Sequence, residues 1–137
     1  MTARAIALTL IAAIFVTARP PDVAARGVRE SLPRRIGACA VTRVKAVETR
    51  LQEGDTNKPI PGSGSAVEFT NGGYQVSYDQ LPAVDQSRPG DLVKMCLVSI
   101  PHHCPPSDVR GREYRTTNLR THQTWRLPDS EHSCGGA

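Results

Sequence analysis

Alternating apolar and polar residues mark a β-hairpin near the middle of the chain. In segments 67–70 (VEFT) and 74–78 (YQVSY) apolar side chains alternate with polar ones, and an Asn-Gly pair lies between them at 71–72. Such alternation is typical of strands with one buried face, and Asn-Gly is favoured in two-residue hairpin turns. With this pair as the loop, Phe69 faces Tyr74, and the pattern predicts a hairpin with one apolar face.

The same register decides which other side chains face water. Val67 falls opposite Val76 on the apolar face, and Glu68 falls opposite Gln75 on the polar face. A shift by one residue would exchange the two faces, because side chains in a strand alternate with a period of two. We therefore expect Gln75 to be in contact with solvent.

The segment before the hairpin fits two kinds of element. In residues 38–51 the apolar positions recur at helical spacing, but the segment is rich in Val and Thr, which favour strands. We interpret it as one long, bent strand. The stretch 52–64 (QEGDTNKPIPGSG) is polar and contains Pro and Gly, so it is predicted to be a loop.

The second half of the chain predicts three further strands. Residues 87–91 (SRPGD) are typical of a type II turn. The nearly all-apolar run 92–100 (LVKMCLVSI) predicts a central strand covered on both sides. Residues 112–119 and 123–127 predict a second hairpin around Arg120-Thr121-His122. The stretches 101–111 and 128–137 are predicted to be loops.

These elements define the expected fold class. Five or six mainly antiparallel strands without a long helix indicate an all-β protein, a small single-domain barrel or sandwich. An OB-like barrel fits best, with a bent first strand, a hairpin, a central strand and a closing pair. The domain is expected to span residues 26–137, of which 26–37 form an exposed lead-in.

The N-terminus indicates export. After Arg4, residues 5–16 (AIALTLIAAIFV) are uninterrupted apolar, and Val23-Ala24-Ala25 offers small residues to a signal peptidase. The apolar run is too short to cross a bilayer about 30 Å thick. We expect residues 1–25 to be a signal peptide and the mature protein to be periplasmic or extracellular, without a transmembrane segment. The alternative is an uncleaved anchor.

Four cysteines follow the predicted cleavage site, namely Cys39, Cys96, Cys104 and Cys134. An even number of cysteines in an exported domain predicts two disulfides. We expect a nested pairing, in which Cys39–Cys134 joins the ends of the domain and Cys96–Cys104 closes a short loop. The alternative pairs Cys39 with Cys96 and Cys104 with Cys134.

Composition and charge limit the classes of partner. The formal net charge is +4, it is spread along the chain, and aromatic residues make up only 4%. Nucleic-acid binders usually cluster their Lys and Arg beside aromatic side chains, so no nucleic acid is expected. A basic surface could meet an envelope protein or an anionic polymer as partner, but the spread of the charge favours a solvated face. A core poor in aromatics also makes the disulfides valuable.

Residues that could carry chemistry are few. Asp129, Ser130 and His132 lie together in the tail. One alternative function is therefore a small secreted hydrolase that uses loop His and Asp residues. His102, His103 and His132 lie beside cysteines and leave a metal-binding protein as another. The His and Cys residues at 102–104 and 132–134 lack the spacing that is typical of zinc sites. We expect no cofactor and no catalytic site.

A candidate interaction patch lies on the predicted second hairpin, where Arg112, Tyr114, Trp125 and Arg126 could combine cationic and aromatic side chains. For Trp125 itself, which alternates with polar neighbours, a core position is favoured over an exposed one. The favoured function is a non-catalytic binding or structural module.

The C-terminal half also resembles small exported bacterial proteins of unassigned role. The resemblance rests on the segments GDLVKMCLVSIP, CPP, RG and DSEHSCGGA and extends over residues 39–137. It implies no activity and no functional residues.

Overall fold

The computed structural model describes residues 31–136 of the chain. The predicted signal peptide and the beginning of the lead-in lie outside the described residues. Six strands and one short helix follow one another, with bounds β1 Cys39–Thr49, β2 Ser65–Phe69, β3 Tyr74–Ser77, α1 Pro82–Asp85, β4 Leu92–Ser99, β5 Glu113–Asn118 and β6 Thr124–Pro128. The expected all-β class with two disulfides is confirmed.

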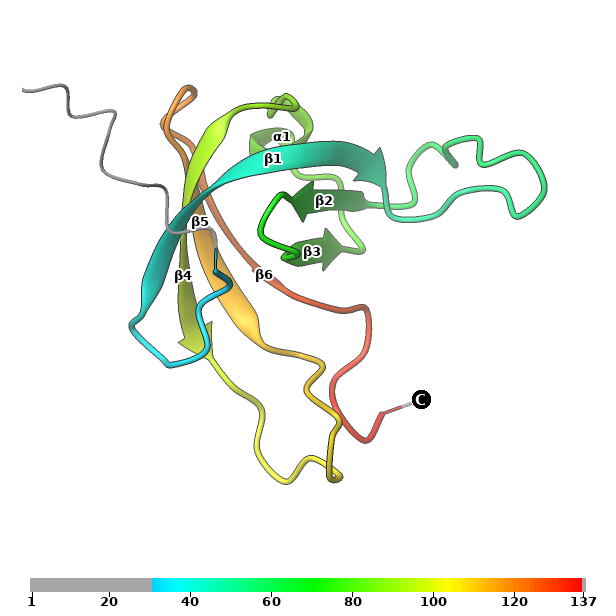
Figure 1. Cartoon of the computed structure of the whole chain (residues 1–137). Coiled ribbons are helices and arrows are strands. Elements are labelled where there is room, and N and C mark those ends of the chain that lie inside the picture. The colour runs from blue at the N-terminus through cyan, green and yellow to red at the C-terminus, as the bar shows by residue number, and fades with distance from the viewer. Residues whose placement is uncertain (1–30, 137) are drawn as a thin grey trace, which may run out of the picture.

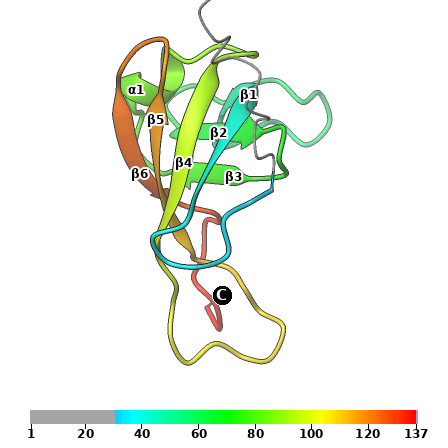
Figure 2. The same cartoon turned by 60° about the vertical axis from the view of Figure 1, so that its left-hand side comes forward.

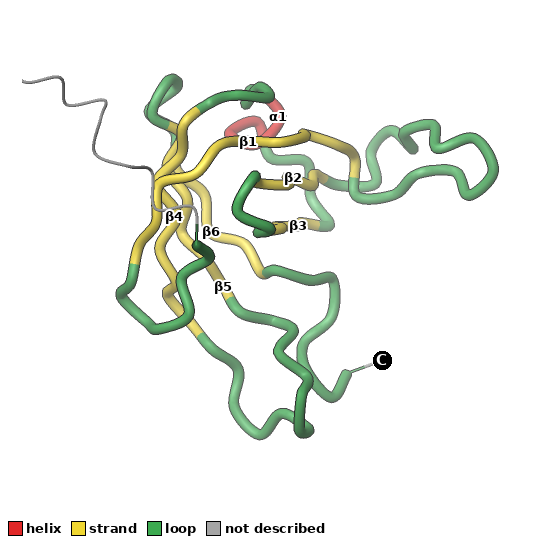
Figure 3. The backbone as a smooth tube through the Cα atoms, in the orientation of Figure 1, coloured by secondary structure: helices red, strands yellow, loops and turns green. Residues whose placement is uncertain are grey.

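All six strands belong to one antiparallel sheet in the order β3-β2-β1-β4-β5-β6. The sheet curls into a half-barrel, so that β6 passes beside β3 although the two strands do not pair (Figures 1 and 2). Two long loops leave this body, one between β1 and β2 and the other between β4 and β5 (Figure 3). The half-barrel is open between β3 and β6, which are the two edge strands of the sheet.

β1 is long and bent, as expected. Its first part, residues 39–43, pairs with β4, and its second part pairs with β2. The register shifts between Val44 and Ala46, which is an irregularity of the kind that bends a strand and increases its twist. One strand therefore serves both halves of the sheet.

β4 is central in the sheet but is covered on one face only, so the prediction of two covered faces is wrong. Val93, Met95 and Leu97 are fully buried inside the half-barrel, whereas Lys94 is exposed on the outer face. A single curled sheet has only one interior, and no described element layers over its outer side. The apolar run in the sequence arises because Leu92, Cys96 and Val98 occupy half-buried outward positions, and Cys96 is bridged to β1.

The register of the β2–β3 hairpin differs by one residue from the prediction. Glu68 pairs with Tyr74, and Val67 pairs with Gln75. The loop comprises residues 70–72, because Phe69 N–H donates to Gly73 O at 2.9 Å. In this three-residue loop Gly72 adopts the left-handed conformation, with φ of 81°. The shift turns Gln75 from the outer face to the interior.

Gln75 is fully buried and has a partner for each of its side-chain polar atoms. Its Nε2 donates to the carbonyl oxygens of Tyr114 at 2.8 Å and of Leu127 at 3.2 Å. Its Oε1 accepts from Thr116 Oγ1 at 2.7 Å and from Trp125 Nε1 at 2.9 Å. This one side chain links β3 to the β5–β6 hairpin across the open edge of the sheet.

The lead-in is not exposed throughout. Leu32 is half-buried against the core, Pro33 is buried, and the Tyr114 hydroxyl donates to Pro33 O at 3.2 Å. The short helix α1 also buries Val84 completely in the same core. Two short non-strand segments therefore help to fill the half-barrel.

The expected nested disulfide pairing is wrong, and the bridges are Cys39–Cys96 and Cys104–Cys134. Cys96 cannot turn back to Cys104 because it lies inside β4, which continues as an extended strand to Ser99. Its direct neighbour across the ladder is Cys39. Cys104 lies in the following loop and ties it to the C-terminal tail.

Removing the Cys39–Cys96 bridge should lower the free energy of unfolding by about 4 kcal/mol, because it closes the longer loop in the unfolded chain, with a sequence separation of 57 residues. The double variant Cys39→Ser/Cys96→Ser is to be compared with Cys104→Ser/Cys134→Ser, whose bridge spans 30 residues. Urea unfolding of both variants measures the effect. Equal stability of the first variant and the parent would contradict the expectation.

Candidate functional site

The outer face of the sheet carries exposed basic side chains on four neighbouring strands. We call the set Arg43 on β1, Lys94 on β4, Arg115 on β5 and Arg126 on β6 the basic stripe. All four point outward because they alternate along their strands with buried residues.

The register of the ladders places these residues on a diagonal. Arg43 pairs with Leu92, two positions before Lys94, and Arg115 pairs with Cys96, two positions after Lys94. Strands are about 4.8 Å apart and residues rise about 3.4 Å along them, so the basic stripe is roughly 20 Å long. This length suits an extended ligand better than a small ion.

Two members of the basic stripe oppose each other directly, since Arg115 and Arg126 are ladder partners. Like charges in such a pair are destabilising. Arg126 is compensated, because its Nε and guanidinium nitrogens donate to Glu113 Oε2. Within residues 31–136, no ion pair holds Lys94 or Arg115. Positive charge is thus concentrated at the middle of the stripe.

Other basic residues are neutralised locally. Arg120 binds the Asp91 carboxylate through both oxygens, at 2.6 Å and 2.8 Å, and Asn118 Nδ2 donates to the same carboxylate at 2.8 Å. Further ion pairs join Lys45 to Glu68, Arg50 to Glu131 and Arg110 to Asp108. Among the described residues, Lys94 and Arg115 at the centre of the basic stripe therefore remain without an ion pair.

Asp91 should make the fold sensitive to acid. Hydrogen bonds from Arg120, then from Asn118 and the backbone, hold the pKa of its carboxyl well below the usual range, and its side chain is only 8% exposed. Below about pH 4 the unfolded chain takes up a proton that native Asp91 does not, so stability falls by up to about 1.4 kcal/mol per pH unit. Urea unfolding of the parent and of Asp91→Asn between pH 5 and 2 measures this, and the variant should have the shallower slope. Parallel slopes would exclude the effect.

The candidate interaction patch does not form one surface. Tyr114 is 1% exposed and Trp125 is 5% exposed, and both belong to the core. Arg112 is half-buried, and Arg126 remains on the surface as part of the basic stripe. The aromatic residues that sequence reasoning offered to a partner are thus held inside the half-barrel, where Gln75 binds one of them.

The residues offered for hydrolysis are brought close without the geometry of a triad. Ser130 Oγ donates to the backbone carbonyl of His132 at 2.6 Å, not to its imidazole. Asp129 Oδ1 accepts from the backbone N–H groups of Gly111 and Arg112 at 2.8 Å and 3.0 Å. Burial raises the pKa of Asp129. These contacts close the loop around Asp129.

The histidines offered for metal binding are exposed, and the neighbouring cysteines are bonded to each other. Within residues 31–136, no group of three or more His, Cys, Asp or Glu side chains could hold a metal ion.

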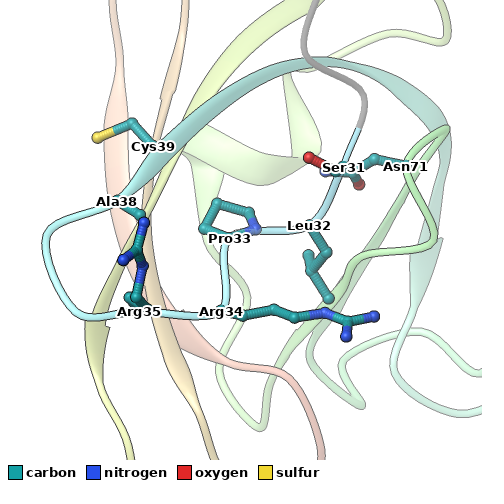
Figure 4. A pocket seen from close by; sticks show the side chains of 8 residues that line it. All are labelled: Ser31, Leu32, Pro33, Arg34, Arg35, Ala38, Cys39 and Asn71. Atoms are coloured by element: carbon teal, nitrogen blue, oxygen red, sulfur yellow. The ribbon is translucent and has the colours of Figure 1, made fainter.

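A hollow of about 570 Å³ lies under the lead-in, between it and the β2–β3 turn. It is lined by Leu32, Arg34, Arg35 and Asn71, among others. Figure 4 shows the side chains of Arg34 and Arg35 pointing in different directions. They do not converge on a point where both could hold one anion.

Known proteins give no family for this chain: no family model matches it, nor does any curated protein or solved structure. In the described part of the chain, no helix is long and apolar enough to cross a membrane. The candidate site therefore rests on the basic stripe, which sequence analysis missed. The sequence does contain a signal for it, because Lys94, Arg115 and Arg126 alternate with inward-facing residues along their strands. These three residues are seen to form one surface only when the strand order is known.

Proposed function

We propose that this protein is an exported, non-catalytic module that binds a linear polyanion along the basic stripe. The observation that carries the proposal is the concentration of unpaired positive charge on neighbouring strands. Arg115 lies directly opposite Arg126 and diagonal to Lys94. Folding alone disfavours this arrangement, and a bound anionic chain would offset the repulsion.

A rigid support strengthens this proposal. The three strands that carry Lys94, Arg115 and Arg126 are held from within by Gln75 and the core, and β4 is bridged to β1 by a disulfide. Disulfides are typical of proteins that work in oxidising compartments, which supports export. The backbone positions of these side chains are thus fixed before a ligand arrives, which reduces the entropy lost on binding.

The surroundings of the basic stripe favour a polyanion over a single-stranded nucleic acid. Non-specific nucleic-acid binders combine cations with exposed aromatic side chains on which bases stack. Tyr114 and Trp125, the aromatic residues of β5 and β6, are buried. Beside the basic stripe lie short polar side chains such as Thr117 and Thr124, which suit phosphate or carboxylate groups at regular intervals.

The test compares two variants with the same loss of charge. Lys94→Gln/Arg115→Gln removes the centre of the basic stripe, and Lys58→Gln/Arg110→Gln removes two positive charges elsewhere. Binding to long-chain polyphosphate and to polygalacturonate is measured by titration at several salt concentrations. We expect the stripe variant to bind about tenfold more weakly in low salt, with the slope of log affinity against log salt reduced by about two.

Two results would overturn the proposal. One is an equal loss of affinity in both variants, because binding would then follow net charge and not the basic stripe. The other is the absence of parent binding to either polymer in low salt. Preference for one polymer would identify the anionic group as phosphate or carboxylate.

A further inference from the structure

We propose that the Cys39–Cys96 disulfide exchanges with an external thiol, and that the sulfur of Cys39 is the atom attacked. The bridge lies on the outer face of the sheet, where two strands pair, and it is not enclosed in the core. This adds a chemical reactivity to the domain that does not depend on the proposed binding of a polyanion.

The first argument is access. Cys39 is exposed, whereas Cys96 is half-buried. Both line a shallow hollow of about 370 Å³, together with Ile36, Val98 and Arg115. Ile36 is 62% exposed, which is unusual for a large apolar side chain. An incoming thiol therefore reaches Cys39 from solvent, and the apolar rim offers a contact for the chain that carries the thiol.

The second argument is charge. Arg115 is the ladder partner of Cys96, and Lys94 points outward from the same strand two residues away. Positive charge next to a cysteine stabilises its thiolate and lowers its pKa. Glu113, the acidic residue on this part of β5, is already bound to Arg126. Arg115 thus stabilises Cys96 as the leaving thiolate, and the exposure of Cys39 makes it the sulfur attacked.

The exchange proceeds in two balanced steps. A thiolate of the reductant attacks Cys39 Sγ, the Cys39–Cys96 bond breaks, and its electron pair leaves on Cys96 Sγ beside Arg115. A second thiolate of the reductant then attacks the reductant's own sulfur in this mixed disulfide and releases Cys39 as a thiolate. The two cysteines gain two electrons, the reductant becomes a disulfide, and water supplies the protons.

The second bridge of the domain is an internal reference. Cys104 and Cys134 are both half-buried, and the Asp108 carboxylate accepts from Gly135 N–H at 3.0 Å, next to Cys134. Asp108 also holds the nearby Arg110. Among the described residues, this bridge therefore has no unpaired cation like Arg115 beside it to stabilise a thiolate. The two disulfides of one chain therefore differ in access and in charge.

We expect the sheet to stay folded, although less stable, when Cys39–Cys96 is reduced. β1 and β4 remain paired over five residue pairs, and β1 also remains paired with β2. The second disulfide still fixes the tail. The exchange is therefore reversible in a folded protein.

The experiment treats the oxidised mature protein with increasing glutathione, traps free thiols with an alkylating reagent and maps them by peptide mass. We expect Cys39 and Cys96 to be trapped before Cys104 and Cys134, with glutathione bound to Cys39 in the early mixed disulfide. Arg115→Gln should slow reduction of this bridge about threefold or more, because the leaving thiolate loses its cation. Lys58→Gln, which removes one exposed positive charge in the β1–β2 loop, should leave the rate unchanged.

Four outcomes would overturn the inference. Earlier reduction of Cys104–Cys134 would show that access and charge do not control the reaction. Glutathione on Cys96 would reverse the assigned attack. An unchanged rate in Arg115→Gln would remove the role of the cation. Loss of the far-ultraviolet circular dichroism spectrum of the sheet on selective reduction would show that the bridge cannot exchange within the folded state.

Discussion

Replacing Gln75 by Leu is expected to lower the free energy of unfolding by roughly 2–5 kcal/mol, although the two side chains are similar in size. The Leu side chain cannot accept from Thr116 Oγ1 or Trp125 Nε1, and both groups are buried. Each buried donor without a partner loses about 1–3 kcal/mol. The carbonyls of Tyr114 and Leu127 keep their positions in the β5–β6 ladder, so the loss falls mainly on the two donors.

Urea unfolding measures this loss, and Gln123→Leu provides the control. Gln123 is also on the second hairpin, but its Nε2 donates to Gln86 Oε1 near the surface, at 2.9 Å. Water can replace that hydrogen bond, so the control should change stability by less than about 1 kcal/mol. Equal losses of stability in the two variants would show that the burial of the Gln75 hydrogen bonds does not increase their contribution to the free energy of unfolding.

A second substitution separates hydrogen bonding from packing. Trp125→Phe removes the indole N–H, and in the Gln75→Leu background it should cost less than it does alone, because the donor has already lost its partner. Independent, additive losses would contradict the hydrogen-bond account. The same cycle tests whether the open edge of the sheet is held through this contact.

The prediction of strands succeeded where a local pattern decides the structure. The long first strand, both hairpins and the turn before β4 were expected from the spacing of apolar residues and from Gly and Pro. Gly90 has φ of 92°, as the type II turn requires. These features depend on a few neighbouring residues, so the sequence carries their signal directly.

The prediction failed where distant segments decide. The hairpin register seemed fixed by Asn71 and Gly72, but the position of Gln75 is decided by four partners that lie about 40 to 50 residues further on. A polar side chain in an alternating strand normally faces water. Nothing in residues 65–77 shows that β5 and β6 offer complementary groups.

The predicted disulfide pairing was wrong for a similar reason. Nearness in sequence favoured Cys96 with Cys104, whereas strand pairing places Cys39 directly opposite Cys96. The basic stripe also needs the strand order, because its members come from β1, β4, β5 and β6. The disulfide therefore depends on the pairing of β1 with β4, and the basic stripe depends on the order β1-β4-β5-β6, and the sequence pattern specifies neither.

Gly64→Ala is the other substitution expected to have a large effect, because Gly64 lies at the point where the β1–β2 loop enters the sheet. Its φ is 113°, and a Cβ there would lie 2.0 Å from Ser77 O and 2.8 Å from the carbonyl of Tyr78. Both contacts are with backbone, so no side chain can rotate away. Since Arg50 N–H donates to Gly64 O at 3.1 Å, a shift of Gly64 also disturbs the end of β1.

We therefore expect Gly64→Ala to lose about 3–5 kcal/mol in urea unfolding, through combined backbone strain and steric conflict. Gly62→Ala is a matched control in the same loop. Gly62 also has a positive φ, of 75°, but a Cβ there meets nothing within 4 Å, so only the conformational cost of about 1 kcal/mol remains. If the two variants lost the same stability, positive φ alone would explain both, and the close approach of β2 to the end of β3 would not constrain this position. A larger loss at Gly64 means that backbone packing anchors the long β1–β2 loop at its base.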